Sequence, residues 1–245
     1  MAPIGFDQVP ANSRVPFTAV EIAGSASVQA PQQLQYEVLL IGQLLSTGTA
    51  DPLTVYQLSS DAQAAELFGP GSQLHRMALT AFRQARDVPV RAIAQADPAG
   101  AQATGSLVFA GTATAAGAVY VYVNGTRMGV AVAVGDTAAT VATAVAAAIT
   151  ADTNLPVTAA AATGTATLTA KHAGIVGNDL DLRLNLAQGE QLPAGITATT
   201  NAFSGGTLSP DYGTLWGVLE PFSPNIWALG DTSAANLTAL DIELE

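Results

Sequence analysis

Two strand-like runs give residues 33–98 the first clear structural pattern in the chain. The first run, residues 38–41, is continuously apolar and is closed by Gly42, which is typical of a strand buried on both faces of a sheet. The second run covers residues 88–94 and includes Arg91. The residues between the runs have helical spacing. The pattern therefore predicts a strand–helix–strand unit whose strands pair in parallel with a right-handed connection.

Two helices are expected between these strands. The first covers residues 62–68, with Asp61 as its N-cap, and stops at the turn of residues 69–71. The second begins at Ser72 and carries apolar residues at spacings of three and four on one face. These apolar residues are Leu74, Ala78, Ala81, Phe82 and Ala85. The arginines of this helix fall largely on its other faces: Arg76, Arg83 and Arg86.

The composition changes at residues 97–100, and Ala, Thr, Gly and Val dominate from there to about residue 206. The pattern predicts a small, mainly β module with one helix, which opens at residues 135–137 and runs to about residue 151. Asn124-Gly125 is a strong signal for a hairpin turn. The expected strands cover residues 107–109, 118–123, 127–134, 157–161, 165–170 and 180–186.

The α/β pattern resumes after Gly205-Gly206. A short helix is expected over residues 212–219, then a strand over residues 225–230, then a helix that begins near Thr232 or Ser233. The chain stops inside this last helix, which suggests truncation. The sequence therefore predicts a partial, split α/β core with an inserted, mainly β (α+β) module.

Four segments follow from this interpretation. They are an extended N-terminal arm (residues 1–32), the first part of the core (33–98), the inserted module with its one helix (99–206) and the resumed core, truncated in a helix (207–245). Four prolines punctuate the arm and oppose helix and central-strand hydrogen bonding: Pro3, Pro10, Pro16 and Pro31. Residues 15–22 of the arm are β-prone and fit an edge or added strand; a disordered tail is the alternative.

The charge balance excludes several classes of partner. The chain has 8 basic and 19 acidic residues, a formal net charge of −11, so it should repel nucleic acid and anionic membranes. It has no cysteine, which excludes disulfides and thiolate metal sites. Its start lacks a signal-peptide pattern, and its apolar stretches fall short of the roughly 20 residues of a spanning helix. A neutral surface rich in Ala, Thr and Gly suits burial against copies of the same protein.

The residue types that carry catalysis form no recognisable constellation. His75 lies on the helix with the arginines and His172 in a predicted turn, and neither is beside a nucleophile-elbow motif. Both are expected to be surface or hydrogen-bonded histidines. The acidic residues are scattered, mostly next to Pro, Gly or Thr in turns, as at Asp97. The sequence therefore predicts no catalytic residues and no enzyme activity.

The glycine-rich segments and acidic pairs do not indicate a bound group either. Residues 69–72 open a helix but lack the lysine of a phosphate-binding loop. Residues 174–179 contain glycines but follow a hairpin. Asp179 and Asp181, with Asn178, lack the spacing of a calcium loop, and two carboxylates on an exposed strand face are the simpler interpretation. No cofactor and no metal are predicted.

A series of short segments in fixed order carries a resemblance to a known family. The strongest is LTAKHAG at residues 168–174, followed by GNDLDLR at residues 177–183. The others are residues 4–10, 14–17, 38–43, 66–72, 155–159, 189–190, 192–195 and 204–207. Together they resemble the contractile tail sheath proteins of Mu-like bacteriophages. The resemblance covers essentially the whole chain and corresponds to roughly the first half of a full-length subunit.

The resemblance implies a structural role without covalent chemistry. Sheath subunits stack as six-fold rings around a tail tube, and on a baseplate signal the sheath shortens and widens and drives the tube through the bacterial envelope. The implied partners are copies of the same protein, in hexameric rings, the tail tube protein, the baseplate and the tail terminator, with no nucleic acid and no membrane. The implied location is the virion, after assembly in the host bacterial cytoplasm.

The family also exchanges terminal arms between neighbours by strand addition. This implies subunit contacts in the arm, at Val15, Phe17, Val20 and Ile22. Arg76 and Arg83 are candidates for bridges to acidic patches of neighbours, and an ordinary solvated helix face is the alternative. The alternative functions are a surface adhesin or carbohydrate-binding β module, for which the module has few aromatic residues, and an enzyme built on the α/β core.

Overall fold

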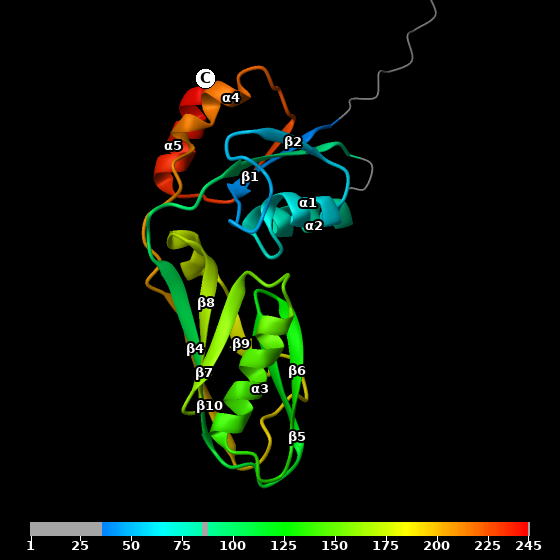
Figure 1. Cartoon of the computed structure of the whole chain (residues 1–245), viewed down its shortest axis with the longest axis vertical. Helices are drawn as coiled ribbons and strands as arrows, with labels where there is room; N and C mark the ends of the chain where they lie inside the picture. Colours follow the sequence, from blue (N-terminus) through cyan, green and yellow to red (C-terminus); the bar gives the residue numbers. More distant parts are fainter. Residues whose placement is uncertain (1–35, 85–87, 245) are drawn as a thin grey trace, which may run out of the picture. The chain divides into compact units, whose positions relative to one another are not determined.

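Three β-sheets and the helices packed on them make up the part of the chain that the computed structural model describes, residues 36–84 and 88–244 (Figure 1). The protein is therefore a mixture of helices and sheets. The predicted arm, with its contact residues Val15, Phe17, Val20 and Ile22, lies outside the described residues. The predicted segment boundaries stay predictions.

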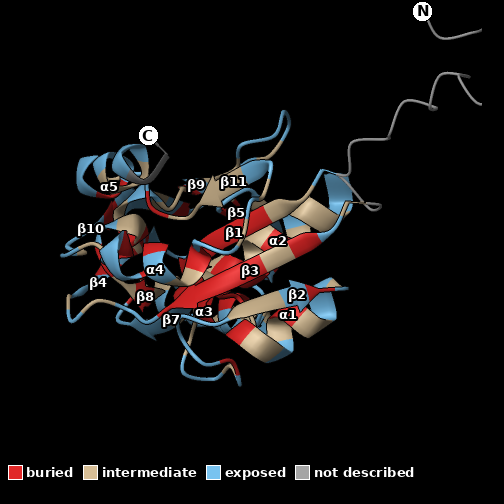
Figure 2. Cartoon of the chain, turned by 90° about the horizontal axis from the view of Figure 1, so that it is seen from above, coloured by how far each residue is buried: buried red, intermediate tan, exposed pale blue. Residues whose placement is uncertain are grey.

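The first sheet has the strand order β11-β1-β3-β2. β1 (Val38–Gln43) pairs in parallel with β3 (Val90–Gln95) on one side and with β11 (Ile226–Leu229) on the other. The predicted parallel pairing of the first two strands is thus confirmed. β2 (Val55–Leu58) pairs antiparallel with β3 and was not predicted, because it is a short edge strand with only one buried residue. Figure 2 shows that burial concentrates in β1 and β3, the two central strands.

Helices cover the two faces of this sheet. On one face, α1 (Asp61–Phe68) and α2 (Gln73–Gln84) pack against β1 and β3 through a cluster that includes Leu40, Phe68 and Leu74. On the other face, η3 (Tyr212–Thr214), α4 (Trp216–Leu219) and α5 (Ala234–Leu244) cover β1 and β11. Burial of apolar side chains on both faces explains why residues 38–41 of β1 form a continuous apolar run rather than an alternating one.

The predicted N-cap of α1 was wrong by one residue. Ser60 has an extended backbone and its hydroxyl accepts a hydrogen bond from the Gln63 N–H, while Asp61 is the first residue of the helix. There the Asp61 carboxylate is well placed near the positive end of the helix dipole. α2 begins as predicted, because the Ser72 hydroxyl accepts from the His75 N–H, 3.1 Å away.

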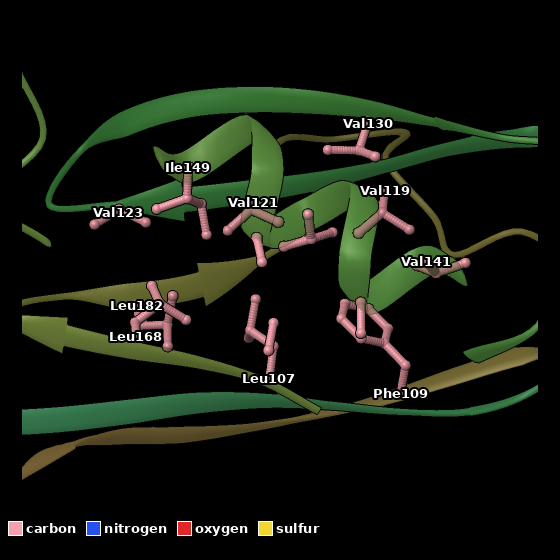
Figure 3. Packing of buried hydrophobic residues seen from close by; sticks show 14 of the residues in the cluster. Leu107, Phe109, Val119, Val121, Val123, Val130, Val141, Ile149, Leu168 and Leu182 are labelled. Carbon is pink, nitrogen blue, oxygen red and sulfur yellow. The ribbon is translucent and has the colours of Figure 1, made fainter. Parts of the chain in front are cut away.

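The other two sheets come from the residues between β3 and η3. One has the antiparallel order β10-β4-β8-β7 and the other β6-β5-β9. Their elements are β4 (Gln102–Gly111), β5 (Gly117–Val123), β6 (Thr126–Val132), α3 (Ala138–Ala151), β7 (Val157–Ala162), β8 (Thr165–Ala173), η2 (Ile175–Asp179), β9 (Leu182–Leu184) and β10 (Ile196–Ser204). α3 and both sheets share one hydrophobic core, to which Leu107, Val121 and Ile149 contribute (Figure 3).

The order of the predicted elements in this β-rich segment was right as far as β8, but the strand predicted over residues 107–109 is the longer β4, and β8 runs three residues beyond its predicted end. Asn124 and Gly125 have φ angles of 45° and 80°, which form the predicted turn between β5 and β6. Thr137 caps α3 where a helix start was predicted. The strand predicted over residues 180–186 is only the three-residue β9, because Asn185, with φ of 47°, ends it. β10 was missed, because its exposed, Thr-rich sequence has no alternating apolar pattern.

Candidate functional site

The carboxyl ends of β1, β3 and β11 lie side by side, and they form the position where open α/β sheets bind ligands. β1 lies between β3 and β11, and its neighbours are connected through helices on opposite faces of the sheet. This is the topological switch point of the sheet. A ligand site of the common α/β type would lie here, next to the first turn of α2.

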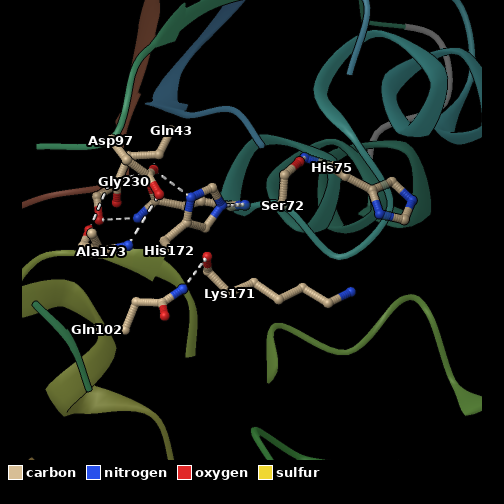
Figure 4. Close-up of polar contacts among 10 residues, drawn as sticks. Gln43, Ser72, His75, Asp97, Gln102, Lys171, His172, Ala173 and Gly230 are labelled. Atoms are coloured by element: carbon tan, nitrogen blue, oxygen red, sulfur yellow. Dashed lines mark hydrogen bonds and ion pairs between the residues drawn. The ribbon is translucent and has the colours of Figure 1, made fainter. Parts of the chain in front are cut away.

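His172, from the end of β8, fills this position (Figure 4). Its Nε2 accepts a hydrogen bond from the Gln73 backbone N–H at 2.9 Å, so the ring caps the first turn of α2. Its Nδ1 therefore carries the proton and donates to Asp97 Oδ1 at 2.6 Å. Asp97 Oδ2 accepts from the Ala173 N–H at 3.0 Å. The predicted turn position of His172 was wrong, because residue 172 belongs to a strand.

Two glutamines extend this polar cluster to the strand ends. The Gln43 Nε2 donates to Asp97 Oδ1 and to the Ala173 carbonyl, each at 3.0 Å. The Gln73 Oε1 accepts from the Gln43 N–H at 2.9 Å, and its Nε2 donates to the Gly230 carbonyl at 2.6 Å. The cluster thus ties β1, β8, β11 and the start of α2 together.

Lys171 and His75 fix the loop that precedes α2. The Lys171 Nζ donates to the carbonyl oxygens of Pro70, at 3.0 Å, and Thr153, at 2.7 Å. The His75 Nδ1 accepts from the Gly71 N–H at 3.0 Å. Burial lowers the pKa of both side chains, since desolvation disfavours their charged forms. Both histidines are hydrogen-bonded, as the sequence led us to expect.

Asp97 and His172 are the residue types of a catalytic dyad, but the ring of His172 has no lone pair left to accept a substrate proton. A general base needs a lone pair that faces the substrate proton. Both ring nitrogens of His172 bond within the chain, and the lone pair of Nε2 is occupied by a backbone N–H. The Asp97–His172 pair therefore joins parts of the fold. Sequence reasoning missed it, because its members are far apart along the chain and each sits in an unremarkable local sequence.

The remaining candidates do not converge on this cluster. Arg76 donates to the carbonyl oxygens of Asn124, at 3.3 Å, and Asn154, at 3.5 Å, and burial lowers its pKa. Arg83 is exposed near the end of α2. Subunit contacts at Arg76 and Arg83 stay predictions.

The acidic pair near residue 180 does not share one strand face, which corrects the expectation. Asp179 ends η2, and Asp181 forms an ion pair with Arg183 at 2.7 Å. Within the described part of the chain there is no group of three or more His, Asp or Glu side chains placed to hold a metal ion. Nor do the described helices include one that is long and apolar enough to cross a membrane.

Comparison with known proteins places the chain next to one kind of phage protein. No protein-family model matches it. It is 37% identical over 250 residues to a protein of Haemophilus influenzae strain Rd named "Mu-like prophage FluMu tail sheath protein". The match covers 98% of this chain and 50% of the relative, so the chain spans about half the length of the curated relative that it matches.

Proposed function

Since this chain belongs to the Mu-like tail sheath proteins, we propose that it forms part of the structural subunit of a contractile phage tail sheath. In this proposal, subunits stack as six-fold rings around the tail tube and contract to drive the tube through the host envelope. The partners are other copies of the subunit, the tube protein, the baseplate and the tail terminator. The subunit assembles in the host cytoplasm and is carried in the virion.

The observation that carries this proposal is a sequence match that extends over 98% of the chain. The geometry at the switch point agrees with it. There the hydrogen-bonding groups of Asp97 and His172 bond to each other and to the backbone, which suits a structural protein rather than an enzyme.

The strand order supports a finer proposal about architecture. β1, β3 and β11 are neighbours in one sheet, although β4 to β10 lie between β3 and β11 along the chain and form two other sheets. This order is the one expected of a core interrupted by an insertion. We therefore propose that residues 33–98 and 207–245 belong to the sheath core and that residues 99–206 are inserted into it.

Contacts between subunits are proposed at two places. Residues 15–22 would add a strand to a neighbouring subunit, with affinity from backbone hydrogen bonds and register from Val15, Phe17, Val20 and Ile22. Arg83 is exposed near the end of α2 and would meet an acidic patch of a neighbour. Arg76 is already bonded to two carbonyl groups, so it would contribute less.

Electron microscopy of a joined polypeptide tests the proposal. In this polypeptide, the chain replaces the matched stretch of the Haemophilus influenzae relative, and the relative itself is the positive control. Hollow tubes built from stacked rings are expected for both proteins. If the relative forms tubes while the joined polypeptide stays monomeric, or turns over a hydrolysable substrate as a monomer, the proposal is wrong.

The same assay tests the predicted role of Arg83. Arg83→Glu reverses the charge of an exposed arginine on α2, and it should reduce the number of tubes. Arg183→Glu is the matched control, because Arg183 is an exposed arginine of the β-rich segment whose ion pair is within the chain. Unchanged assembly of the Arg83 variant would remove this contact from the proposal.

A further inference from the structure

An apolar groove of about 570 Å³ lies over the α2 face of the first sheet. Its floor is formed by side chains from β1, β3 and β11: Val38, Leu40, Val90 and Ala228. One wall is α2, through Met77, Thr80, Ala81 and Gln84. The other wall comes from the β-rich segment, through Pro156, Ala170, Val176 and Leu180. The groove is therefore a gap beside α2 above a sheet face.

Among residues 36–84 and 88–244, only one face of β11 is covered, and the groove lies on the other. Trp227 and Leu229 pack on the side of η3, α4 and α5. On the α2 side, Ala228 is only partly buried, at the margin of the cluster around Leu40. Ile226 points to the same side as Ala228, pairs in register with Val38 and is 46% exposed. Parallel strands are normally covered on both faces, whereas the described part of the chain leaves the α2 side of β11 uncovered.

The polar groups around the groove argue against a small-molecule ligand. Such sites orient their ligand with a few convergent polar groups. Here the side chains of Gln73, Arg76 and His172 are bonded within the chain. Among the described residues that line the groove, Gln43 has a buried atom without a partner, its Oε1. A single amide oxygen can accept from two donors at most, and most of the remaining lining is apolar.

The shape of the floor favours a helix. A strand binds to a sheet edge through its backbone groups, whereas this floor is a sheet face, whose side chains pack against another layer. α2 already lies on this face as the neighbouring cover. A second helix beside α2, with an apolar face toward Ala228 and Val38, would complete the layer.

We propose that the groove receives an amphipathic helix from the half of the sheath polypeptide that this chain does not contain; the inference rests on the proposed function. The matched relative is about twice as long as the chain, so a comparable length of polypeptide is available. β11 is at the edge of the sheet that the described residues form, next to the groove, so further core elements can join there. A covalently linked helix also has a high effective concentration at the groove.

Thiol labelling tests this occupant. The chain has no cysteine, so Thr80→Cys introduces a unique thiol at an exposed position that lines the groove. Leu186→Cys is the control, because Leu186 is 57% exposed and lies outside the groove. Maleimide labelling of both variants is followed by mass spectrometry, in the chain alone and in the joined polypeptide, at concentrations where neither assembles. The Thr80 variant should react at least tenfold more slowly in the joined polypeptide, with no change for the Leu186 variant.

A second substitution links the protection to the groove floor. Ala228→Glu places a charge on this floor, and in the joined polypeptide it should restore fast labelling of the Thr80 variant. Equal labelling rates in the chain alone and in the joined polypeptide would overturn the inference. So would protection that appears in the chain alone and grows with its concentration, since a second copy would then fill the groove. Tube formation is scored separately, so failure of the sheath proposal is distinguishable from failure of this one.

Discussion

Replacing His172 with alanine removes the side chain that joins the end of β8 to the first turn of α2. In the native protein the ring accepts from the Gln73 N–H and donates to Asp97. Alanine offers neither group; the ring is almost fully buried, the Gln73 N–H that it leaves belongs to a half-buried residue, and Asp97 is exposed to water. The substitution therefore tests whether the polar cluster holds the β-rich segment to the first sheet.

The expected cost follows from the partners left behind. An unpaired buried N–H costs about 1–3 kcal/mol, and Gln73 loses its acceptor outright. Asp97 loses less, because its carboxylate keeps the Gln43 side chain and the Ala173 N–H. We expect His172→Ala to lower the free energy of unfolding by about 2–3 kcal/mol.

Urea denaturation measures this loss, and hydrogen exchange locates it. The exchange rate of the Gln73 amide should rise more than that of amides in α3, because only the first turn of α2 loses its cap. Thr167→Ala is the control on the same strand, since Thr167 is exposed, and it should change stability by less than about 0.5 kcal/mol. A His172→Ala variant as stable as this control, with an unchanged Gln73 exchange rate, would refute the reasoning.

Three further predictions concern the loop before α2 and the core of the β-rich segment. Burial lowers the pKa of His75 from 6.5, so near and below that pH the unfolded chain binds more protons than the folded one. The free energy of unfolding, measured by urea denaturation, should therefore fall as the pH drops through about 6.5. The His75→Gln substitution should make this fall smaller. Gly71 and Gly125 have similar φ angles, 78° and 80°, but a methyl group at Gly71 would clash with the Leu155 carbonyl whereas one at Gly125 meets no neighbour. Thermal melting should therefore show a clearly larger loss of stability for Gly71→Ala than for the control Gly125→Ala. Leu168→Ala should cost about 2–5 kcal/mol in urea denaturation, since Leu168 is fully buried against α3 and both sheets of that core; a cost below about 1 kcal/mol would contradict the packing described.

Local sequence signals predicted the elements that depend on local chemistry. The apolar run of β1, the Asn124-Gly125 turn and the start of α3 at Thr137 each need only residues close to one another in sequence. β2 and β10 were not predicted, because their sequences have no clear strand pattern and they form strands by pairing with β3 and β4, which are distant in sequence. β10 in particular buries few side chains, so its identity as a strand comes from its backbone bonds to β4.

The polar cluster could not be predicted for a related reason. Asp97 was interpreted as one of several acidic residues in turns, and His172 as a turn residue. Their contact depends on how β8 ends against the first sheet, which no spacing in the sequence encodes. The resemblance to tail sheath proteins did include residues 168–174, but it indicated a family and not a contact.

The hydrogen bond made by the Nε2 lone pair of His172 distinguishes an enzyme from a structural protein at this switch point. An enzyme at the switch point would keep the Nε2 of His172 free for a proton of its substrate, and a ligand would replace the residues of β8 at the strand ends. Here the Nε2 accepts from the Gln73 N–H, so removal of the ring should cost stability whether or not any small molecule is present. In the proposed sheath, work comes from rearranged contacts between copies, and each copy must keep its internal contacts while its neighbours move. Hydrogen bonds that join the β-rich segment to the first sheet within one chain meet that requirement, and the same bonds occupy both ring nitrogens of His172.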